Sequence, residues 1–206
     1  MRFVDLSHPF IDRMPTYAGD PTPTLTEIAS IEKNGYTNHL TTAGMHVGTH
    51  IDAPMHMIPG GKKISDYPVD YFIGHGVFLD ARGCERIDET LLNTIQLHPK
   101  NILLICTGWS KKFQGPSYFT EYPEMTVACA ERIVDAGVKM IGFDTASPDK
   151  PPYLVHKIFL SRDILIIENL THLEQLIGIP IFDIVALPIP YTAGGAPARI
   201  IAGIPS

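Results

Sequence analysis

The amino-acid sequence predicts one α/β domain, residues 1–206, built around a largely β core. Short apolar or alternating runs outnumber helical patterns, and the two kinds of segment are mixed along the chain. Eighteen prolines and seventeen glycines are spread over the whole length, which predicts many turns and irregular connections. With 206 residues, of which 45% are hydrophobic, the chain is long enough to bury a sizeable core.

The predicted strands are short runs in which apolar and β-branched residues are frequent. In chain order they span residues 2–7, 36–45, 76–81, 101–108, 138–144, 164–170, 182–187 and 198–204. The run at 101–108, NILLICTG, is apolar over most of its length. We therefore expect Cys106, within this run, to be buried as a small hydrophobic side chain.

Three segments have helical patterns. Residues 123–137, PEMTVACAERIVDAG, have a proline near the start, apolar residues at helical spacing and a closing glycine, so both ends of a helix are marked. Shorter helices are expected at 88–95, DETLLNTI, and at 151–161, PPYLVHKIFLS, where prolines come first. Strands still outnumber helices, which indicates a mixed fold with a β core.

Composition and charge argue against several classes of partner. The formal net charge of -6 leaves no basic surface, so we expect neither nucleic acid nor an anionic membrane as a partner, but a small-molecule substrate. The first residues, MRFVDLSHPF, have no basic region followed by an apolar one, so no secretory signal is predicted. The apolar stretch 177–191 is interrupted by Asp183 and three prolines, which argues against a membrane span.

The cysteines indicate a reducing compartment. There are three, Cys84, Cys106 and Cys129, and they are too far apart for any CxxC pair. An odd, scattered set is typical of reduced thiols in a cytosol rather than of a disulfide framework. The expected localisation is therefore cytoplasmic.

One stretch of eleven residues, HVGTHIDAPMH at 46–56, holds three of the nine histidines together with an aspartate. Gly48 and Pro54 disfavour a helix there. In a straight strand His46 and His50 would lie roughly 13 Å apart, too far to bind one ion. We therefore expect the backbone to bend at Gly48, while Pro54 holds the residue before it in an extended conformation.

The residue types in this stretch suit a catalytic metal site. Imidazole nitrogens and a carboxylate oxygen, with no cysteine nearby, are typical ligands of zinc, manganese or ferrous iron. Three ligands from one short segment and a spare histidine match a site that leaves a position open for water. The alternative is that these histidines only hydrogen-bond one another or cap turns.

The remaining ligands of such a site stay open at this point. Glu168 ends the apolar run 164–170, where a buried carboxylate needs a partner or a metal, although a strand-end residue can also reach water. The other histidines that are possible distant ligands are His8, His39, His75, His98, His156 and His172.

The motif HxGTHxDxPxH resembles the signature of the metal-dependent cyclase family, which includes the bacterial kynurenine formamidases. Other segments resemble family motifs in the family's order: YAGDPTP at 17–23, LLICTGWS at 103–110, IGFDTASPD at 141–149, HKIFLSRDILIIENL at 156–170 and ALPIPYTAGGAPARIIA at 186–202. The resemblance implies a β-barrel-like core flanked by helices, of the swivelling β/β/α type. It also implies assembly as a homodimer or larger homo-oligomer.

The resemblance assigns two divalent metal ions to the matched positions, zinc first and manganese as the alternative. His46, His50 and Asp52 would bind one ion, and Asp52 would also bridge to the second. His156 and Glu168 would complete the second ion, with Glu168 bridging from the other side.

Two further roles are implied for residues that are not ligands. His56 would be the catalytic acid and base. Tyr17 would contact the substrate, at a position where kynurenine formamidases carry a tryptophan. Tyr17 keeps an aromatic ring at this position but lacks the indole of tryptophan.

The function implied by the resemblance is that of a dinuclear metal-dependent hydrolase of a small amide. Its most concrete form is an arylformamidase that converts N-formylkynurenine to kynurenine and formate in tryptophan degradation. The nearest alternative keeps the chemistry and changes the substrate to an isatin-like cyclic amide, a lactone or an ester. A more distant alternative is a non-catalytic metal-binding module, which would bind metal without turnover.

Overall fold

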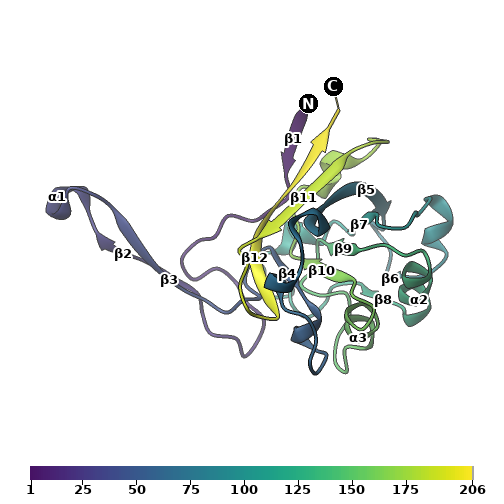
Figure 1. Cartoon of the computed structure of the whole chain (residues 1–206), viewed down its shortest axis with the longest axis horizontal. Helices are drawn as coiled ribbons and strands as arrows, with labels where there is room; N and C mark the ends of the chain where they lie inside the picture. Colours follow the sequence, from purple (N-terminus) through teal and green to yellow (C-terminus); the bar gives the residue numbers. More distant parts are fainter. Residues whose placement is uncertain (206) are drawn as a thin grey trace.

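A computed structural model describes residues 1–205 of the chain. The core strands form one continuous mixed sheet. These strands are β1 (Arg2–Asp5), β4 (His50–Asp52), β5 (Ile73–Asp80), β7 (Ile102–Cys106), β9 (Met140–Phe143), β10 (Leu165–Glu168), β11 (Asp183–Pro188) and β12 (Gly195–Ile204). Around the sheet the order is β12, β11, β5, β7, β9, β10 and β4, and β4 pairs again with β12. Seven strands therefore close into a barrel, and β1 pairs with β12 outside the ring (Figure 1).

The barrel has a parallel half and an antiparallel half. β5, β7, β9 and β10 run parallel to one another, whereas every pairing that involves β4, β11 or β12 is antiparallel. β7 is buried along its whole length, and its consecutive side chains alternate between two apolar cores: Ile102 and Leu104 pack in one, Leu103 and Ile105 in the other. Because both faces of the strand are covered, the sequence is apolar at every position.

Two helices, α2 (Val127–Asp135) and α3 (Leu154–Leu160), lie on one side of the barrel (Figure 1). The third, α1 (Ile31–Asn34), lies far from them, at the opposite end of the molecule. α2 confirms the helix expected at 123–137 but starts later, because the Thr126 side chain accepts a hydrogen bond from the Cys129 backbone N–H and caps it. α3 confirms the helix expected at 151–161. The segment 88–95 forms only a 3₁₀ turn, Leu91–Thr94.

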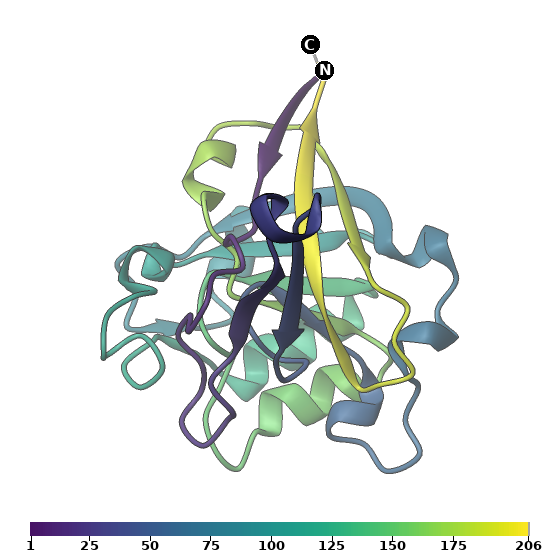
Figure 2. The ribbon, with the colours of Figure 1, turned by 90° about the vertical axis from the view of Figure 1, so that its left-hand side faces the viewer.

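A hairpin of β2 (Thr24–Ala29) and β3 (Asn38–Thr42) projects away from the barrel, as Figures 1 and 2 show, with α1 at its tip. β3 falls within the strand expected at 36–45, while β2 has no counterpart among the predicted strands. All five residues of β3 are exposed, so nothing in the chain itself buries this strand. Two further short strands, β6 (Arg86–Ile87) and β8 (Glu124–Met125), pair with each other.

Two expectations from composition can be compared with this fold. Cys106 is 1% exposed and packs in the barrel core, as expected, and all three cysteines are free thiols. Among the helices that residues 1–205 form, none has the length and apolar character needed to cross a membrane. The sequence-based expectation of an α/β fold with a barrel-like β core and flanking helices is confirmed.

Candidate metal centre

The segment 46–56 bends where the sequence predicts. Gly48 has φ of +63°, in the left-handed region that favours glycine, and it separates the loop carrying His46 from strand β4. Ala53 is extended (φ −107°, ψ 162°), as expected for the residue before Pro54, and a 3₁₀ turn then carries His56. The bend folds three histidines and Asp52 back toward one another.

The closure of the barrel brings Glu168 to this segment. β4 pairs with β10, and in that register Glu168 lies directly opposite His50. Glu168 is also the last residue of β10, at the carboxyl end of the parallel half of the sheet. His156 comes from α3, which packs beside β10. Residues more than one hundred positions apart in the sequence therefore meet at one point.

We call His46, His50, Asp52, His156 and Glu168 the metal cluster. All but His46 are buried, and the His46 side chain is 30% exposed. Their ligand atoms form two overlapping sets within 4.8 Å of one another, one of His46, His50 and Asp52 and the other of Asp52, His156 and Glu168.

Asp52 and Glu168 each direct their two oxygens toward different histidines. Asp52 Oδ1 lies 2.7 Å from His46 Nδ1 and 3.4 Å from His50 Nε2, while Oδ2 lies 3.9 Å from His156 Nε2. Glu168 Oε2 lies 3.4 Å from His50 Nε2, and Oε1 lies 3.0 Å from His156 Nε2. Both carboxylates therefore lie between His50 and His156.

The imidazole rings are held by hydrogen bonds on their outer nitrogens. His50 Nδ1 donates to the Gly48 carbonyl (2.9 Å), which directs Nε2 and its lone pair into the cluster. His156 Nδ1 donates to Asp149 Oδ1 at 2.6 Å, and the other Asp149 oxygen accepts the Val155 backbone N–H. A carboxylate behind a ligating histidine is the usual partner in metal sites, where it fixes the ring and raises its basicity.

The charges of the cluster attract positive charge. Burial disfavours a charged His50, but Asp52 and Glu168 raise its pKa to about 10. For His156 burial also opposes the charge, and hydrogen bonds to Asp149 and Glu168 raise its pKa to about 10. Burial and the like charge of Asp52 would raise the pKa of Glu168, yet its hydrogen bond to His156 and its contact with His50 lower it. Two buried carboxylates this close require a cation or protons.

One structural observation indicates that the cluster can hold divalent metal ions. His50 Nε2 and Asp52 Oδ2 are buried and have no hydrogen-bond partner among residues 1–205, and the contacts of His50 Nε2 with the two carboxylates lack hydrogen-bond geometry. Buried polar atoms are rarely left without a partner. Both atoms point into the cluster, and the nitrogen and oxygen donors suit zinc or manganese.

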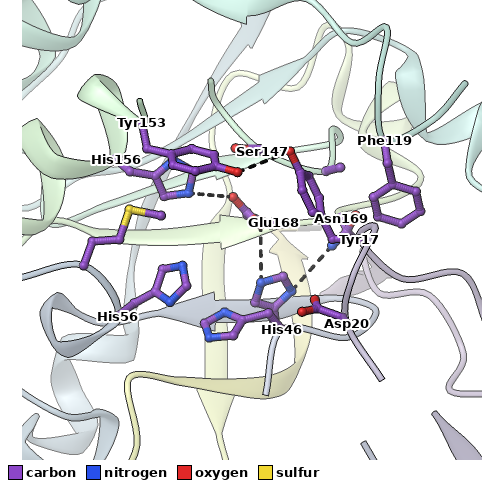
Figure 3. Close-up of a pocket in the computed structure, with 13 residues that line it drawn as sticks. Tyr17, Asp20, His46, His56, Phe119, Ser147, Tyr153, His156, Glu168 and Asn169 are labelled. Carbon is purple, nitrogen blue, oxygen red and sulfur yellow. Dashed lines mark hydrogen bonds and ion pairs between the residues drawn. The ribbon is translucent and has the colours of Figure 1, made fainter. Parts of the chain in front are cut away.

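His56 lies beside His46 in the wall of a cavity of about 220 Å³ (Figure 3). Its ring lies 4.0 Å from that of His46 and 6.2 Å from that of His156, measured between ring centres. Burial lowers the pKa of His56, with Asp52 acting in the opposite direction. His56 belongs to neither ligand set, so the structure places its imidazole beside the cluster rather than within it.

Three aromatic residues line the same cavity and form what we call the aromatic rim: Tyr17, Phe119 and Tyr153. Tyr17 packs edge-on against Phe119, with ring centres 6.1 Å apart. The remaining lining residues are Asp20, His46, His50, His56, Met57, Ala146, Ser147, His156, Glu168 and Asn169. Tyr17 thus lies where a substrate contact was expected, whereas sequence reasoning missed Phe119 and Tyr153.

A buried polar network supports the segment 46–56 from behind. Asn169 Nδ2 donates to the Gly48 carbonyl, the group that also orients His50, and Asn169 Oδ1 accepts from the Tyr118 hydroxyl, both at 2.9 Å. Asn169 adopts φ of +56°, a conformation that no local sequence signal predicts. Nearby, Thr49 Oγ1 donates to the Asn169 carbonyl.

Two motifs identified in the sequence meet through Asp144. This buried carboxylate accepts hydrogen bonds from the Thr107 backbone and hydroxyl and from the Gly108 backbone. The contacts join the turn after β7, in LLICTGWS, to the turn after β9, in IGFDTASPD. The second turn also supplies Asp149, the hydrogen-bond partner of His156. Asp144 therefore links the turn after β7 to the turn that carries this partner.

All seven residues that the sequence singles out for the site belong to the metal cluster or line this cavity. Of the distant histidines left open, only His156 joins the cluster. His75 contacts Asp183 on the exposed part of the barrel, and His8 stacks on Phe113. The signal that could have revealed Asp149 was the motif IGFDTASPD, which ends on it.

Comparison with known proteins agrees with this architecture. A family model named Cyclase matches residues 4–150. A kynurenine formamidase from Bacillus cereus is 30% identical over 206 residues, covering 97% of this chain and 96% of that protein. Isatin hydrolase A from Labrenzia aggregata, solved with benzyl benzoate, has a TM-score of 0.88 at 20% identity, covering 100% of this chain and 94% of that one. A predicted metal-dependent hydrolase from Bacillus stearothermophilus has a TM-score of 0.79 at 26% identity, covering 98% and 97% of the two chains.

Proposed function

The chain belongs to the cyclase family, and on that premise we propose that it is a metal-dependent hydrolase that cleaves the C–N bond of a small amide. The reaction proposed first is that of an arylformamidase, which converts N-formylkynurenine to kynurenine and formate in tryptophan degradation. The observation that carries the proposal is the pair of ligand sets sharing Asp52, with His56 free beside them in a cavity rimmed by aromatic rings.

The metal cluster would hold two divalent ions, with zinc proposed first and manganese second. His46, His50 and Asp52 would bind one, while Asp52, His156 and Glu168 would bind the other. Ions in these positions would supply a water molecule of lowered pKa and a Lewis acid for the carbonyl oxygen of the substrate.

The chain's own residues would do the remaining work. His56 would take the proton of the attacking water on its imidazole and pass it to the leaving amine nitrogen, which general acid–base catalysis requires at neutral pH. The lowered pKa of His56 keeps the imidazole in the neutral form that can accept this proton. The aromatic rim would stack on the aryl group of the substrate and exclude water from the cavity.

The nearest rival keeps this chemistry and changes the substrate to an isatin-like cyclic amide, a lactone or an ester. The more distant rival, a metal-binding module without catalysis, gives no reason for His56 to face the cluster. Isatin and N-formylkynurenine, assayed side by side, separate the two hydrolases.

The decisive experiment measures kcat/KM for N-formylkynurenine with protein reconstituted separately with zinc and with manganese. A value at or above about 10⁴ M⁻¹s⁻¹ would establish the formamidase. A much lower value, with two ions per chain found by elemental analysis, would redirect the search to isatin, lactones and esters. Full metal occupancy without turnover of any of them would leave the metal-binding module.

We also propose that the chain forms a homodimer or a larger homo-oligomer. The projecting hairpin supports this, since Ile31 and Leu40 on it are 65% and 56% exposed, and contiguous apolar surface marks interaction sites. The mass in solution, measured by light scattering, tests the proposal. Leu40→Lys should then lower the mass, and a wild-type monomer would refute the assembly.

A further inference from the structure

A glycine on strand β12 lies directly against one imidazole of the metal cluster. Gly195 is the first residue of β12 and lies opposite Asp52 of β4, in the pairing that closes the barrel (Figure 1). The carbonyl of the preceding residue, Gly194, accepts a hydrogen bond from the Ala53 backbone N–H at 2.8 Å. Because these contacts join β12 to β4, Gly195 cannot draw back from the segment 46–56 without opening the barrel.

The backbone conformation does not explain why position 195 is a glycine. Gly195 does not have positive φ, so the left-handed conformation that favours glycine is not the reason. The surroundings give one instead. A Cβ atom at this position would lie 2.6 Å from His46 Cε1, and 3.1 and 3.2 Å from the two ring nitrogens of His46. The missing side chain therefore leaves the space that the His46 ring occupies.

The His46 ring depends on packing more than the other two histidines of the cluster do. His50 and His156 each direct Nδ1 at a group behind the cluster, whereas His46 Nδ1 lies 2.7 Å from a carboxylate oxygen within it. The His46 side chain is also 30% exposed, and its ring lies 4.0 Å from that of His56. Packing against His56 and Gly195 therefore orients this ring, whereas hydrogen bonds orient the other two.

The space between Gly195 and His46 is too small for a methyl group. Ordinary contacts of a Cβ atom lie at 3.4–4 Å, so Gly195→Ala would displace the His46 ring by about 1 Å. The ring can rotate about its side-chain bonds, so it yields before the paired strands do. Because a metal–ligand distance tolerates only about 0.2 Å, a displacement of this size weakens the bond to the ion.

We propose that Gly195 is a positioning residue of the metal centre, which holds His46 in place as a ligand by leaving room for its ring. The inference rests on the proposed function, because it takes His46 as a metal ligand. It adds a role for strand β12, which supplies no member of the metal cluster. This strand fixes the most exposed ligand through a side chain that it lacks.

The first experiment measures metal affinity in the full chain by competition with a chromophoric chelator. Gly203→Ala is the matched control, since Gly203 lies on the same strand without positive φ, and a Cβ atom there would lie 3.3 Å from the exposed and movable Phe3. We expect Gly195→Ala to weaken the binding of one ion by about 10- to 100-fold, the scale of losing the support of a ligating histidine. Gly203→Ala should bind both ions as the wild type does.

The second experiment separates positioning from a general loss of stability. In metal-free protein Gly195→Ala should lower Tm by about 2–10 °C through overpacking. In a His46→Ala background the ring that the Cβ atom meets is absent, so the same substitution should lower neither Tm nor metal affinity any further. If Gly195→Ala alone does not fold, recovery of folding in the His46→Ala background supports the inference in the same way.

Two results would overturn the inference and leave the hydrolase intact. One is equal metal affinity of Gly195→Ala and the wild type. The other is a loss of Tm, affinity or folding that persists in the His46→Ala background, since the Cβ atom would then act on the barrel and not on the ring. A wild-type chain that binds no divalent ion would instead remove the proposed function, and the role of Gly195 with it.

Discussion

The metal cluster and the aromatic rim line the same cavity but are built in different ways. The cluster stands on β4, β10 and α3 and on one bent loop, and burial and hydrogen bonds fix its rings and carboxylates. The rim stands on loops and on the residue that precedes α3, and Tyr17, Phe119 and Tyr153 are only partly buried. The barrel thus fixes the chemistry, while residues attached to it through loops select what is bound.

The largest effect should follow from Glu168→Gln, which removes one carboxylate charge of the cluster and keeps the shape. Breaking a buried charged cluster typically costs about 3–5 kcal/mol, so metal affinity should fall by about 10²- to 10⁴-fold. Competition with a chromophoric chelator measures this. The exposed Glu174→Gln is the matched control.

The same titration on Tyr17→Phe sharpens the comparison, because a rim residue should not change metal affinity. Equal affinity of Glu168→Gln and the wild type would remove Glu168 from the ligands. Weaker binding in Tyr17→Phe would show that rim and cluster are not separate units.

His56→Ala should retain both ions and lose about 10²-fold or more in kcat, the scale of general acid–base catalysis. His56 faces the cluster but lies in neither ligand set, so its loss should affect the proton and not the metal. Metal content and kcat are measured on one preparation, with the exposed His39→Ala as control. Loss of metal in parallel with activity would make His56 a ligand, and unchanged turnover would remove it from the mechanism.

The sequence predicted most of the site where its determinants are local. The bend at Gly48 and the extended residue before Pro54 follow from backbone sterics within one segment, and both are observed. The choice of His156 and Glu168 required the family resemblance. Their approach depends on the pairing of β4 with β10, a long-range register that no local pattern contains.

Sequence reasoning missed several residues because their conformations depend on tertiary packing. Tyr153 and Asn169 have positive φ although neither is a glycine, because surrounding packing holds them there. Strand β2 was missed because it lies on the projecting hairpin and buries little of its surface, so its sequence need not be strongly apolar. Most of the predicted elements, in contrast, have apolar faces that fill the two apolar cores, and the fully exposed β3 is the exception.

Asp149→Asn tests the support behind the cluster and should have a moderate effect. Its carboxylate accepts both the His156 Nδ1–H and the Val155 N–H, and an amide can accept only one of these. Metal affinity should fall by about 10- to 100-fold, as it does when the partner of a ligating histidine is removed. Excess metal should restore kcat in this variant but not in His56→Ala. The exposed Asp135→Asn is the control, and a kcat that stays low at saturating metal would contradict a supporting role.

The smallest effect, a change in stability, is expected for Gly48→Ala, where the metal-binding loop meets Met14. Gly48→Ala adds a Cβ at φ of +63°, 2.9 Å from the Cε atom of Met14, whereas Gly35→Ala adds one at φ of +77° with nothing within 4 Å. Both should lose about 1–2 kcal/mol for the left-handed conformation. In a chain of this size each kcal/mol lowers Tm by about 2–4 °C.

The difference between the two Tm values isolates the contact with Met14. Met14 is 2% exposed and precedes Tyr17 by three residues, so it joins the metal-binding loop to the segment that carries the rim. If Gly48→Ala is the less stable of the two, the contact with Met14 is rigid and couples the metal-binding loop to the segment that carries Tyr17. Equal Tm values would mean that the flexible end of Met14 yields, and that cluster and rim can change independently.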